Sequence, residues 1–350
     1  MTLTAFARHI AFAALIACIS AALVRLMIDI GVMDRPDPRK SHQRPTPKSG
    51  GVGVVAGFLL GIATLYEFAF FSRLADPYFR GLILASALIA IVAFLDDLRD
   101  WPFAVKLAAQ IIAALAALTS GLYVRVYHLP YVGAVDLGWF GAGASLVWIL
   151  FTTNAMNFID GLNGLAGGVA LIASLFLCVI AEHLGGWFVY FAALLLAAGL
   201  IGFLPFNFPR ARIFMGDVGS QFCGFVLAML GIAASRFEHA AMSFLIVPLL
   251  LSGVLFDVAF TLARRTLAGE RVTAPHRGHL YQVAARSGLD ARWVALIHWG
   301  FAALGGIVCF AFLAASSLEK PLWLLIPLAV QVIWLGFVYQ RARRAGIGAW

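Results

Sequence analysis

The sequence predicts an all-α protein that crosses a membrane about eleven times. Of its 350 residues, 62% are hydrophobic and only 12% are charged, whereas soluble domains carry roughly 25% charged residues. The apolar residues form continuous runs along the whole chain, and this excludes an outer-membrane barrel, in which apolar and polar residues alternate. Runs of about 20 apolar residues match the length of a spanning helix. We expect a single transmembrane domain over residues 1–350, without a separate soluble domain.

The expected spans follow the apolar runs in order along the chain, and their ends are set where charged or turn-forming residues begin. They are residues 9–30, 50–71, 79–96, 104–120, 138–153, 165–182, 187–205, 220–235, 240–263, 292–314 and 321–340. With the N-terminus outside, 19 of the 25 lysines and arginines fall on the inner side. Because basic residues are retained on the cytoplasmic side, we expect the N-terminus outside and the C-terminus in the cytoplasm.

The net charge of +8 would suggest nucleic-acid binding in a soluble protein. In this chain the positive-inside distribution explains it, so no nucleic-acid partner is expected. The four cysteines all lie within apolar runs. They indicate small packing residues, and neither a disulfide nor a zinc site is expected.

The first inner loop, residues 34–51, is rich in proline and in cations and ends at Gly50 and Gly51. One interpretation is an anchor on anionic lipid headgroups. The other is a binding loop for a diphosphate, with Lys48 as a contact and the glycines allowing the next helix to begin close to a ligand.

Two adjacent carboxylates, Asp96 and Asp97, end the third expected span. Acids are disfavoured at the C-terminus of a helix, and two ionised acids repel each other. A solvated helix end is the plain alternative. A bound divalent cation would relieve both penalties, and oxygen ligands with phosphate indicate Mg²⁺ or Mn²⁺ more than zinc.

Asn154, Asn157 and Asp160 recur every three residues where the fifth expected span reaches the cytosol. On a helical turn they would share one face, although a simple Asn- and Gly-rich turn is the alternative. Asp217 stands between glycines at the start of another span. It is either an N-terminal cap or a metal ligand brought beside Asp96 and Asp97.

The loop before the tenth expected span contains His276, Arg277 and His279. A zinc site would need a cysteine or a third histidine close by, so phosphate binding is the favoured interpretation. Asp257 and Arg264, near the inner end of the ninth expected span, are interpreted as a structural ion pair or a capped helix end.

Taken together, the motifs over residues 30–290 resemble those of the polyprenyl-phosphate N-acetylhexosamine-1-phosphate transferase superfamily, glycosyltransferase family 4. The resemblance rests on the Pro- and Lys-rich first loop, on Asp96-Asp97 followed by Lys106 and Gln110, and on the Asn154–Gly161 motif. It also rests on the segment from Asn207 through Phe214-Met215-Gly216-Asp217 to Ser220, and on the His276–His279 loop.

The resemblance implies a Mg²⁺-dependent enzyme, with Mn²⁺ as an alternative ion, that moves a sugar-1-phosphate from a UDP-amino sugar to undecaprenyl or another polyprenyl phosphate and releases UMP. It implies Asp217 as the Mg²⁺ ligand, with Asp97 as a second candidate ligand, and Asp96, Asp97, Asp217 and His279 as catalytic residues. It assigns substrate binding to Lys48, Asn157, Asp160, Asn207, Phe214, His276 and Arg277, with Asn207 and Phe214 as uridine contacts.

The last loop lacks the three consecutive histidines of the peptidoglycan branch and is more similar to members that start O-antigen or other surface polysaccharides. A GlcNAc, FucNAc or QuiNAc donor is therefore preferred, and a phospho-MurNAc-pentapeptide transferase is the alternative. A proton-coupled transporter is less favoured because the acids gather at one interface, without two related halves. The resemblance also implies the bacterial inner membrane, and a homodimer is left open.

Overall fold

The computed structural model describes residues 2–34, 45–69, 76–99, 101–129, 133–236, 242–271, 274 and 276–348. Most of the cationic first loop, residues 35–44, therefore lies outside the described residues. The long helices are α1 (Leu3–Ile30), α2 (Gly51–Phe68), α4 (Asp76–Arg99), α5 (Phe103–Thr119), α6 (Gly138–Ile159), α7 (Leu165–Leu184), α8 (Trp187–Asn207), α9 (Gly216–Arg236), α11 (Ser252–Leu267), α13 (Ala291–Ala314) and α14 (Lys320–Arg344). The short ones are α10 (Ile246–Leu250) and α12 (Leu280–Arg286).

Within the described ranges, nine helices are long and apolar enough to cross a membrane, and α5 is a shorter apolar helix. The chain is thus a helical, multi-pass membrane protein, as the composition predicts. Large apolar side chains such as Leu325 and Ile333 on α14 and Leu15 on α1 are exposed. In water such faces would be unfavourable, whereas in lipid they meet hydrocarbon.

One expected span is wrong in detail. Residues 242–245 are not helical, and the segment expected as 240–263 is divided into α10 and α11 at Leu251. Pro248 lies in the first turn of α10, where its missing N–H has no helical acceptor in any case, whereas a helix running through it from residue 240 would lose a hydrogen bond. Two short antiparallel ribbons were also not expected: β1 (Met33–Asp34) pairs with β2 (Thr46–Pro47), and β3 (Val126–Leu129) pairs with β4 (Gly133–Asp136).

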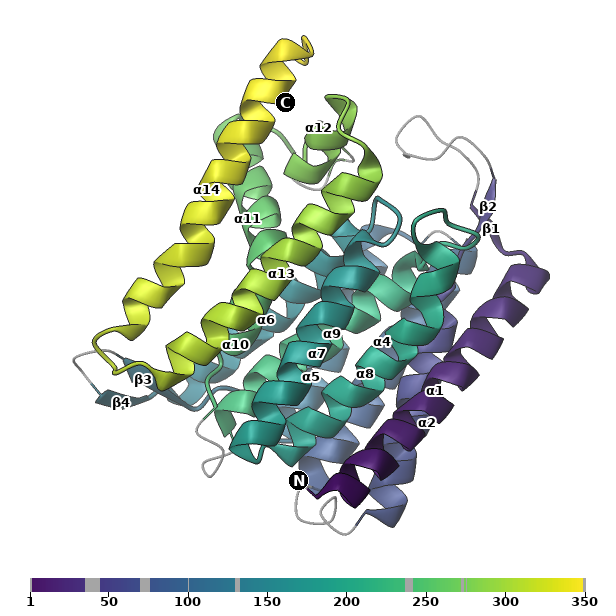
Figure 1. Cartoon of the computed structure of the whole chain (residues 1–350), viewed down its shortest axis with the longest axis vertical. Coiled ribbons are helices and arrows are strands. Elements are labelled where there is room, and N and C mark those ends of the chain that lie inside the picture. The colour runs from purple at the N-terminus through teal and green to yellow at the C-terminus, as the bar shows by residue number, and fades with distance from the viewer. Residues whose placement is uncertain are drawn as a thin grey trace.

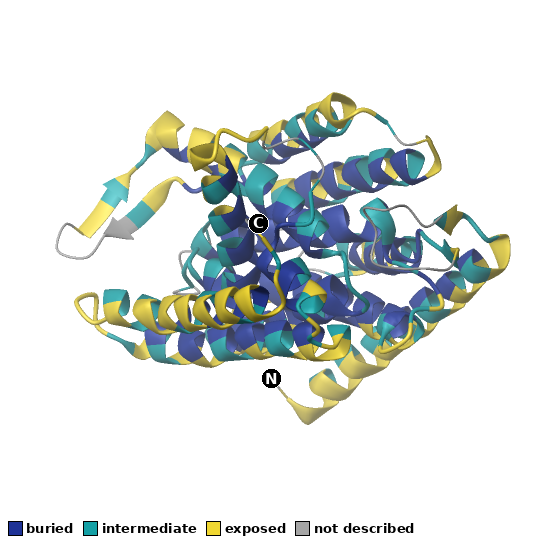
Figure 2. Ribbon diagram, turned by 90° about the horizontal axis from the view of Figure 1, so that it is seen from above, coloured by how far each residue is buried: buried dark blue, intermediate teal, exposed yellow. Residues whose placement is uncertain are grey.

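Helices α8 and α9 form the centre of the bundle, and α1 and α14 lie at its periphery. Figure 2 shows the buried residues gathered in the middle of the molecule and the exposed ones around the outside. The start of α9 lies directly against the start of α2: a Cβ at Gly51 would be 2.3 Å from the Gly219 Cα. These two glycines are therefore needed for the close approach of the two helix ends.

The helices bring the polar motifs to one end of the bundle. The β1–β2 ribbon, α12 and the C-terminus lie at this end, whereas the N-terminus and the β3–β4 ribbon lie at the other (Figure 1). The last turns of α4 and α6 and the first turns of α2, α5 and α9 meet here, because consecutive spans run in opposite directions.

Candidate active site

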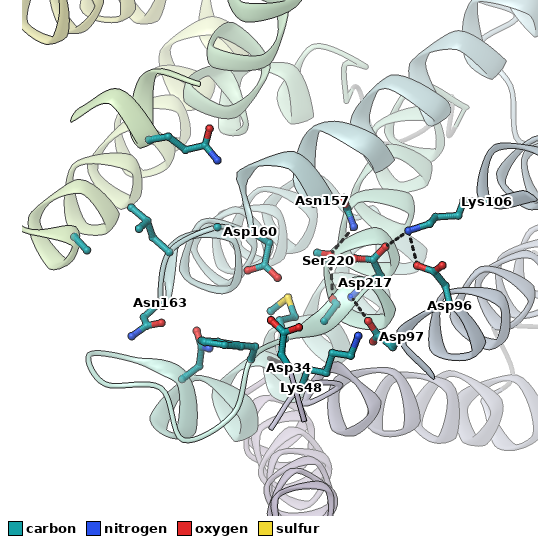
Figure 3. Close-up of a pocket in the computed structure, with 18 residues that line it drawn as sticks. Asp34, Lys48, Asp96, Asp97, Lys106, Asn157, Asp160, Asn163, Asp217 and Ser220 are labelled. Carbon is teal, nitrogen blue, oxygen red and sulfur yellow. Dashed lines mark hydrogen bonds and ion pairs between the residues drawn. The ribbon is translucent and has the colours of Figure 1, made fainter. Parts of the chain in front are cut away.

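A cavity of about 470 Å³ opens where these five helix ends converge (Figure 3). This volume is within the range of small-molecule sites, roughly 300–1,000 Å³. Five carboxylates and two ammonium groups are among its described lining residues, so the lining carries an excess of negative charge. The lining residues are Asp34, Lys48, Asp96, Asp97, Lys106, Asn157, Asp160, Gly161, Leu162, Asn163, Asn207, Phe214, Met215, Gly216, Asp217, Ser220, Gln282 and Ala291.

Lys106, in the first turn of α5, connects two of the predicted catalytic carboxylates. Its Nζ forms an ion pair with Asp96 Oδ2 in the last turn of α4, and it lies 3.2 Å from Asp217 Oδ2 in the first turn of α9. The other oxygen of Asp96, Oδ1, accepts from the backbone N–H of Trp101 at 2.7 Å. Asp96 is almost fully buried, whereas the side chains of Lys106 and Asp217 are 26% and 29% exposed. The lysine and Asp217 can therefore meet a ligand in the cavity.

Asp97 has a different surrounding from its neighbour Asp96. Its carboxylate accepts from the backbone N–H groups of Asp217 at 3.1 Å and Val218 at 3.4 Å, and from Ser49 Oγ at 3.0 Å. It thus caps the N-terminus of α9 from another helix and joins it to the start of α2. Gly216 has a φ of +74°, and a Cβ there would be 2.4 Å from Asp97 Oδ2, so glycine is required beside this carboxylate.

We expect Asp97→Ala to lower both the activity and the stability of the protein. The substitution leaves two N–H groups of α9 and the Ser49 hydroxyl without their acceptor, which costs about 1–3 kcal/mol of unfolding free energy. It also loosens the turn that carries Asp217. Thermal unfolding in detergent should show a lower Tm, and Asp97→Asn, which keeps one acceptor oxygen, should lie between Asp97→Ala and the wild type. An unchanged Tm in Asp97→Ala would contradict the capping role.

The end of α6 supplies the other polar wall. Asn157 is in the last turn of α6, and its Nδ2 donates to Ser220 Oγ at 3.2 Å. Asp160 follows the helix as its C-terminal cap residue, so the three-residue periodicity holds for Asn154 and Asn157 but ends before Asp160. Burial raises the pKa of Asp160 well above its ordinary value, and the charges of Asp217 and Asp97 raise it further. This cavity therefore disfavours additional negative charge unless a cation enters with it.

The first loop and the loop before α9 hold each other in place. Phe214 N donates to Pro47 O at 2.8 Å, and Gly50 N donates to Phe214 O at 2.9 Å. These bonds place Lys48 and Phe214 on the cavity wall. Asn207 also lines the cavity, but both ends of its amide bind backbone: Oδ1 accepts from Gly164 N at 2.6 Å and Nδ2 donates to Ile213 O at 2.9 Å. Asn207 therefore fixes two loops at the rim.

The structure does not place His276, Arg277 and His279 among the described residues that line the cavity. His279 is 4% exposed. Burial lowers the pKa of His276 to about 4, with smaller contributions from His279, Arg265 and Arg264. His276 is therefore neutral at pH 7. Its Nδ1 accepts from Gly278 N at 3.1 Å, so the ring presents an Nε2–H donor.

Asp257 anchors this loop, a role that the sequence did not indicate. Its Oδ1 lies 2.9 Å from His279 Nδ1 and accepts from Leu280 N at 3.0 Å, and its Oδ2 accepts from Tyr281 N at 3.0 Å. Tyr281 in turn donates through its hydroxyl to Phe158 O at 2.9 Å. The buried carboxylate of α11 therefore holds α12 against the end of α6, and α12 contributes Gln282 to the cavity.

Asp257→Ala should detach α12 from the bundle. It leaves a buried imidazole and two N–H groups without their acceptor, and breaking a buried pair in this way costs about 3–5 kcal/mol. Limited proteolysis should cut the chain between residues 268 and 279 faster than in the wild type. Asp290→Ala, which removes an exposed carboxylate bonded to Arg292, is the control and should leave the cleavage rate almost unchanged. Equal rates in all three proteins would contradict the anchor.

The carboxylates of the cavity could hold a magnesium ion that also takes ligands from water and substrate. The described residues contain no group of three or more His, Cys, Asp or Glu side chains that could enclose a metal. Mg²⁺ usually binds through one or two carboxylates, water and substrate phosphates, and the partly exposed Asp217 offers such a carboxylate.

Lys106, Gln110, Ser220, Gln221 and Gln282 were not predicted as site residues. Lys106, Gln110 and Ser220 belong to the motifs that carry the resemblance, and this was the available signal.

Comparisons with known proteins indicate the family of the chain. The family model described as glycosyl transferase family 4 matches residues 79–235. A decaprenyl-phosphate N-acetylglucosaminephosphotransferase of Mycobacterium tuberculosis is 32% identical in an alignment that covers 87% of this chain and 81% of the relative. Undecaprenyl-phosphate alpha-N-acetylglucosaminyl 1-phosphate transferases of Thermotoga maritima and Yersinia pestis are 30% and 26% identical; the matches cover 76% and 91% of this chain, and 76% and 87% of the relatives. The segment matched by the family model runs from α4 to α9 and contains Asp96, Asp97 and Asp217.

Proposed function

The chain belongs to glycosyl transferase family 4, and from this premise we propose that it transfers N-acetylglucosamine-1-phosphate from UDP-N-acetylglucosamine to a polyprenyl phosphate and releases UMP. The observation that carries the proposal is the cavity at one end of the spanning helices, where Asp96, Asp97, Lys106 and Asp217 converge. A lipid acceptor reaches such a site from the bilayer and a nucleotide sugar reaches it from water.

The reaction forms one P–O bond and breaks one. A phosphate oxygen of the lipid attacks the β-phosphorus of the donor, and the bond from that phosphorus to the oxygen bridging to the α-phosphate breaks. UMP leaves, and the lipid becomes a polyprenyl diphosphate sugar. The acceptor phosphate is itself a nucleophile, so the main task of the site is to bring two anions together.

The excess of carboxylates in the cavity supports a divalent cation as part of the site. Asp217, partly exposed in the first turn of α9, would hold Mg²⁺ or Mn²⁺. The ion would supply charge neutralisation for the phosphates. Lys106 and Lys48 present ammonium groups to the same phosphates, whereas Asp97 keeps Asp217 in position through the α9 backbone. Asp96 holds Lys106 and lines the cavity; in this proposal it accepts a proton from an acceptor phosphate that arrives protonated, whose second pKa is about 6.

The donor sugar is tested with purified protein, undecaprenyl phosphate and Mg²⁺. UDP-GlcNAc, UDP-FucNAc, UDP-QuiNAc and UDP-MurNAc-pentapeptide are supplied separately, and UMP release is measured. We expect release with UDP-GlcNAc and little with the pentapeptide donor. Release with the pentapeptide donor alone would favour a peptidoglycan enzyme, and no release with any donor would contradict the proposed function.

We further propose eleven membrane crossings in the bacterial inner membrane. The additional crossings are α5 and the pair α10–α11. Helix α5 connects Lys106 at the site end to the β3–β4 ribbon at the other end, and α10–α11 returns the chain from the end of α9 to the Asp257 anchor. With basic residues retained inside, the site end faces the cytoplasm and the N-terminus faces out.

Cysteine labelling tests this orientation. Cys18 is exposed and the other three cysteines are buried, so Cys18→Ser gives a suitable background. Ala268→Cys places a thiol at the site end, and Ala134→Cys places one in the opposite ribbon; both positions are exposed. In spheroplasts, a membrane-impermeant maleimide should label Ala134→Cys at once and Ala268→Cys only after lysis. The reverse pattern would contradict the proposed topology.

A further inference from the structure

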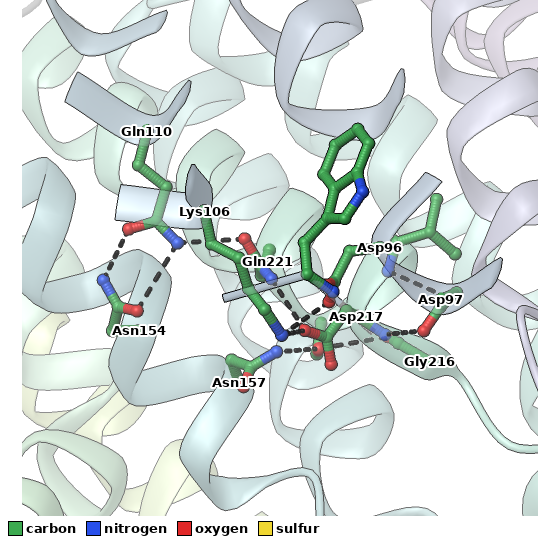
Figure 4. Close-up of polar contacts among 12 residues, drawn as sticks. Asp96, Asp97, Lys106, Gln110, Asn154, Asn157, Gly216, Asp217 and Gln221 are labelled. Carbon is green, nitrogen blue, oxygen red and sulfur yellow. Dashed lines mark hydrogen bonds and ion pairs between the residues drawn. The ribbon is translucent and has the colours of Figure 1, made fainter. Parts of the chain in front are cut away.

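Three carboxamides, two of them buried and the third partly buried, form a chain that leads to Asp217 (Figure 4). Gln110 is on α5, Asn154 on α6 and Gln221 on α9, so three separate helices contribute one amide each. Gln110 and Gln221 are 2% and 4% exposed, and none of the three lines the cavity. They cannot contact a substrate there.

Each amide of this chain donates an N–H to the next group on the way to Asp217, and one longer bond, from Gln110 to Asn154, runs the other way. Asn154 Nδ2 donates to Leu150 O at 2.8 Å and to Gln110 Oε1 at 2.7 Å. Gln110 Nε2 donates to Gln221 Oε1 at 2.9 Å and also lies 3.4 Å from Asn154 Oδ1. Gln221 Nε2 donates to Asp217 Oδ2 at 3.0 Å.

The chemistry of its two ends fixes this direction. The carbonyl of Leu150 can only accept, so the nitrogen of Asn154 must face it. Each following amide must then accept through its oxygen from the amide before it and donate through its nitrogen to the group after it. The chain ends on the carboxylate of Asp217, which also can only accept. A flip of one amide would set two acceptors or two donors against each other in a buried place, which costs a full unmade hydrogen bond.

We propose that Gln221, Gln110 and Asn154 are positioning residues that hold the Asp217 carboxylate ready for a divalent cation. This inference rests on the proposed function, in which Asp217 binds the ion. Lys106 also holds Asp217 Oδ2, but it neutralises part of the charge that would attract the ion. The amide chain orients the same oxygen with neutral dipoles, so it removes none of the negative charge that Lys106 leaves. Outer partners of metal ligands typically change metal affinity by about 10–100-fold when they are removed.

The test measures ion binding directly and does not depend on turnover. Mn²⁺ is titrated into the purified full-length protein, and unbound Mn²⁺ is followed by electron paramagnetic resonance. We expect Gln221→Met to weaken Mn²⁺ binding by about 10-fold or more. Gln110→Met should weaken it less, because Gln221 keeps its own bond to Asp217. The double variant should bind as Gln221→Met does, because Gln110 acts only through Gln221.

Ser145→Ala is the matched control. Ser145 is also buried, lies on α6 as Asn154 does, and uses its hydroxyl between Val124 N and Gly141 O near the other end of that helix. It should change the Tm but not the Mn²⁺ affinity. Should Gln221→Met fail to purify, Gln110→Met still tests the chain, from a helix that does not carry Asp217.

Several outcomes overturn the inference. Wild-type affinity in both methionine variants would do so, as would multiplying effects in the double variant, or a wild type that binds no Mn²⁺. The proposed function fails separately: a wild type that releases no UMP with any donor contradicts the transferase, whereas the Mn²⁺ titration still decides on the amide chain.

Discussion

Asp217→Asn is expected to abolish UMP release and to remove most of the affinity for Mg²⁺ or Mn²⁺. The substitution removes the negative charge of a side chain that lines the cavity and forms an ion pair with Lys106. The amide keeps nearly the same size and can still accept from Gln221 through its oxygen. Lys106 keeps Asp96 as its partner. The variant should therefore fold, with a Tm close to that of the wild type.

The measurement compares three proteins. Turnover and Mn²⁺ binding are determined for the wild type, Asp217→Asn and Asp136→Asn; the last changes an exposed acid that pairs with Arg125 at the opposite end of the bundle. The control should match the wild type in both properties. Turnover of Asp217→Asn within a few-fold of the wild type, at the same Mg²⁺ concentration, would remove Asp217 as the metal ligand.

Lys106→Met should lower kcat/KM by about 100-fold or more, a loss typical for a donor that stabilises transition-state charge. The ammonium group lies between Asp96 and Asp217 at the cavity surface, where the phosphates of both substrates must meet. Lys106→Arg keeps the charge but changes its shape and donor geometry, so it should retain partial activity.

Lys106→Met should strengthen Mn²⁺ binding although it lowers kcat/KM. Lys106 places a positive charge 3.2 Å from Asp217 Oδ2, and that charge disfavours a second cation at the same carboxylate. Lys106→Met should therefore bind Mn²⁺ more tightly than the wild type while turning over more slowly. Lys320→Met, at the start of α14, is the control and should change neither property. Weaker Mn²⁺ binding in Lys106→Met would indicate that the lysine only maintains the structure.

Much of the candidate site could be predicted, because clustered acids and amides at the ends of apolar helices are energetically unfavourable unless they bind another group or a ligand. Asp96, Asp97, Asn157, Asp160 and Asp217 were all identified in this way, and the structure brings them to one cavity. The positive-inside distribution predicts that they lie on one side of the membrane, and the structure brings them to one end of the bundle.

The roles within that set could not be predicted, because they depend on contacts between distant segments. Asp96 and Asp97 are neighbours in sequence, but one holds Lys106 and the other caps α9, which begins about 120 residues later. A lysine at the start of a span is what membrane topology predicts anyway, so Lys106 did not stand out. Gln110 and Gln221 are buried amides whose pairing exists only after α5, α6 and α9 are packed.

Asp257 shows the same limit for the fold. Its spacing from Arg264 indicated an ion pair or a cap within one helix, whereas its carboxylate binds His279, Leu280 and Tyr281 across a loop. The division of the expected span 240–263 was also missed, although Pro248 within the run indicates that a helix begins or ends near it. Both features depend on how α11 packs against its neighbours.

The most direct test of the proposed transfer follows the β-phosphate of the donor. Purified protein is incubated with undecaprenyl phosphate, Mg²⁺ and UDP-GlcNAc labelled with ³²P in the β-phosphate, and the lipid and aqueous phases are separated. Transfer of sugar-1-phosphate predicts that the label enters the lipid phase as a polyprenyl diphosphate sugar while unlabelled UMP appears in water, and that Asp217→Asn does neither. Label that stays in water as UDP, with sugar on the lipid, would show cleavage at the wrong bond and contradict the proposal.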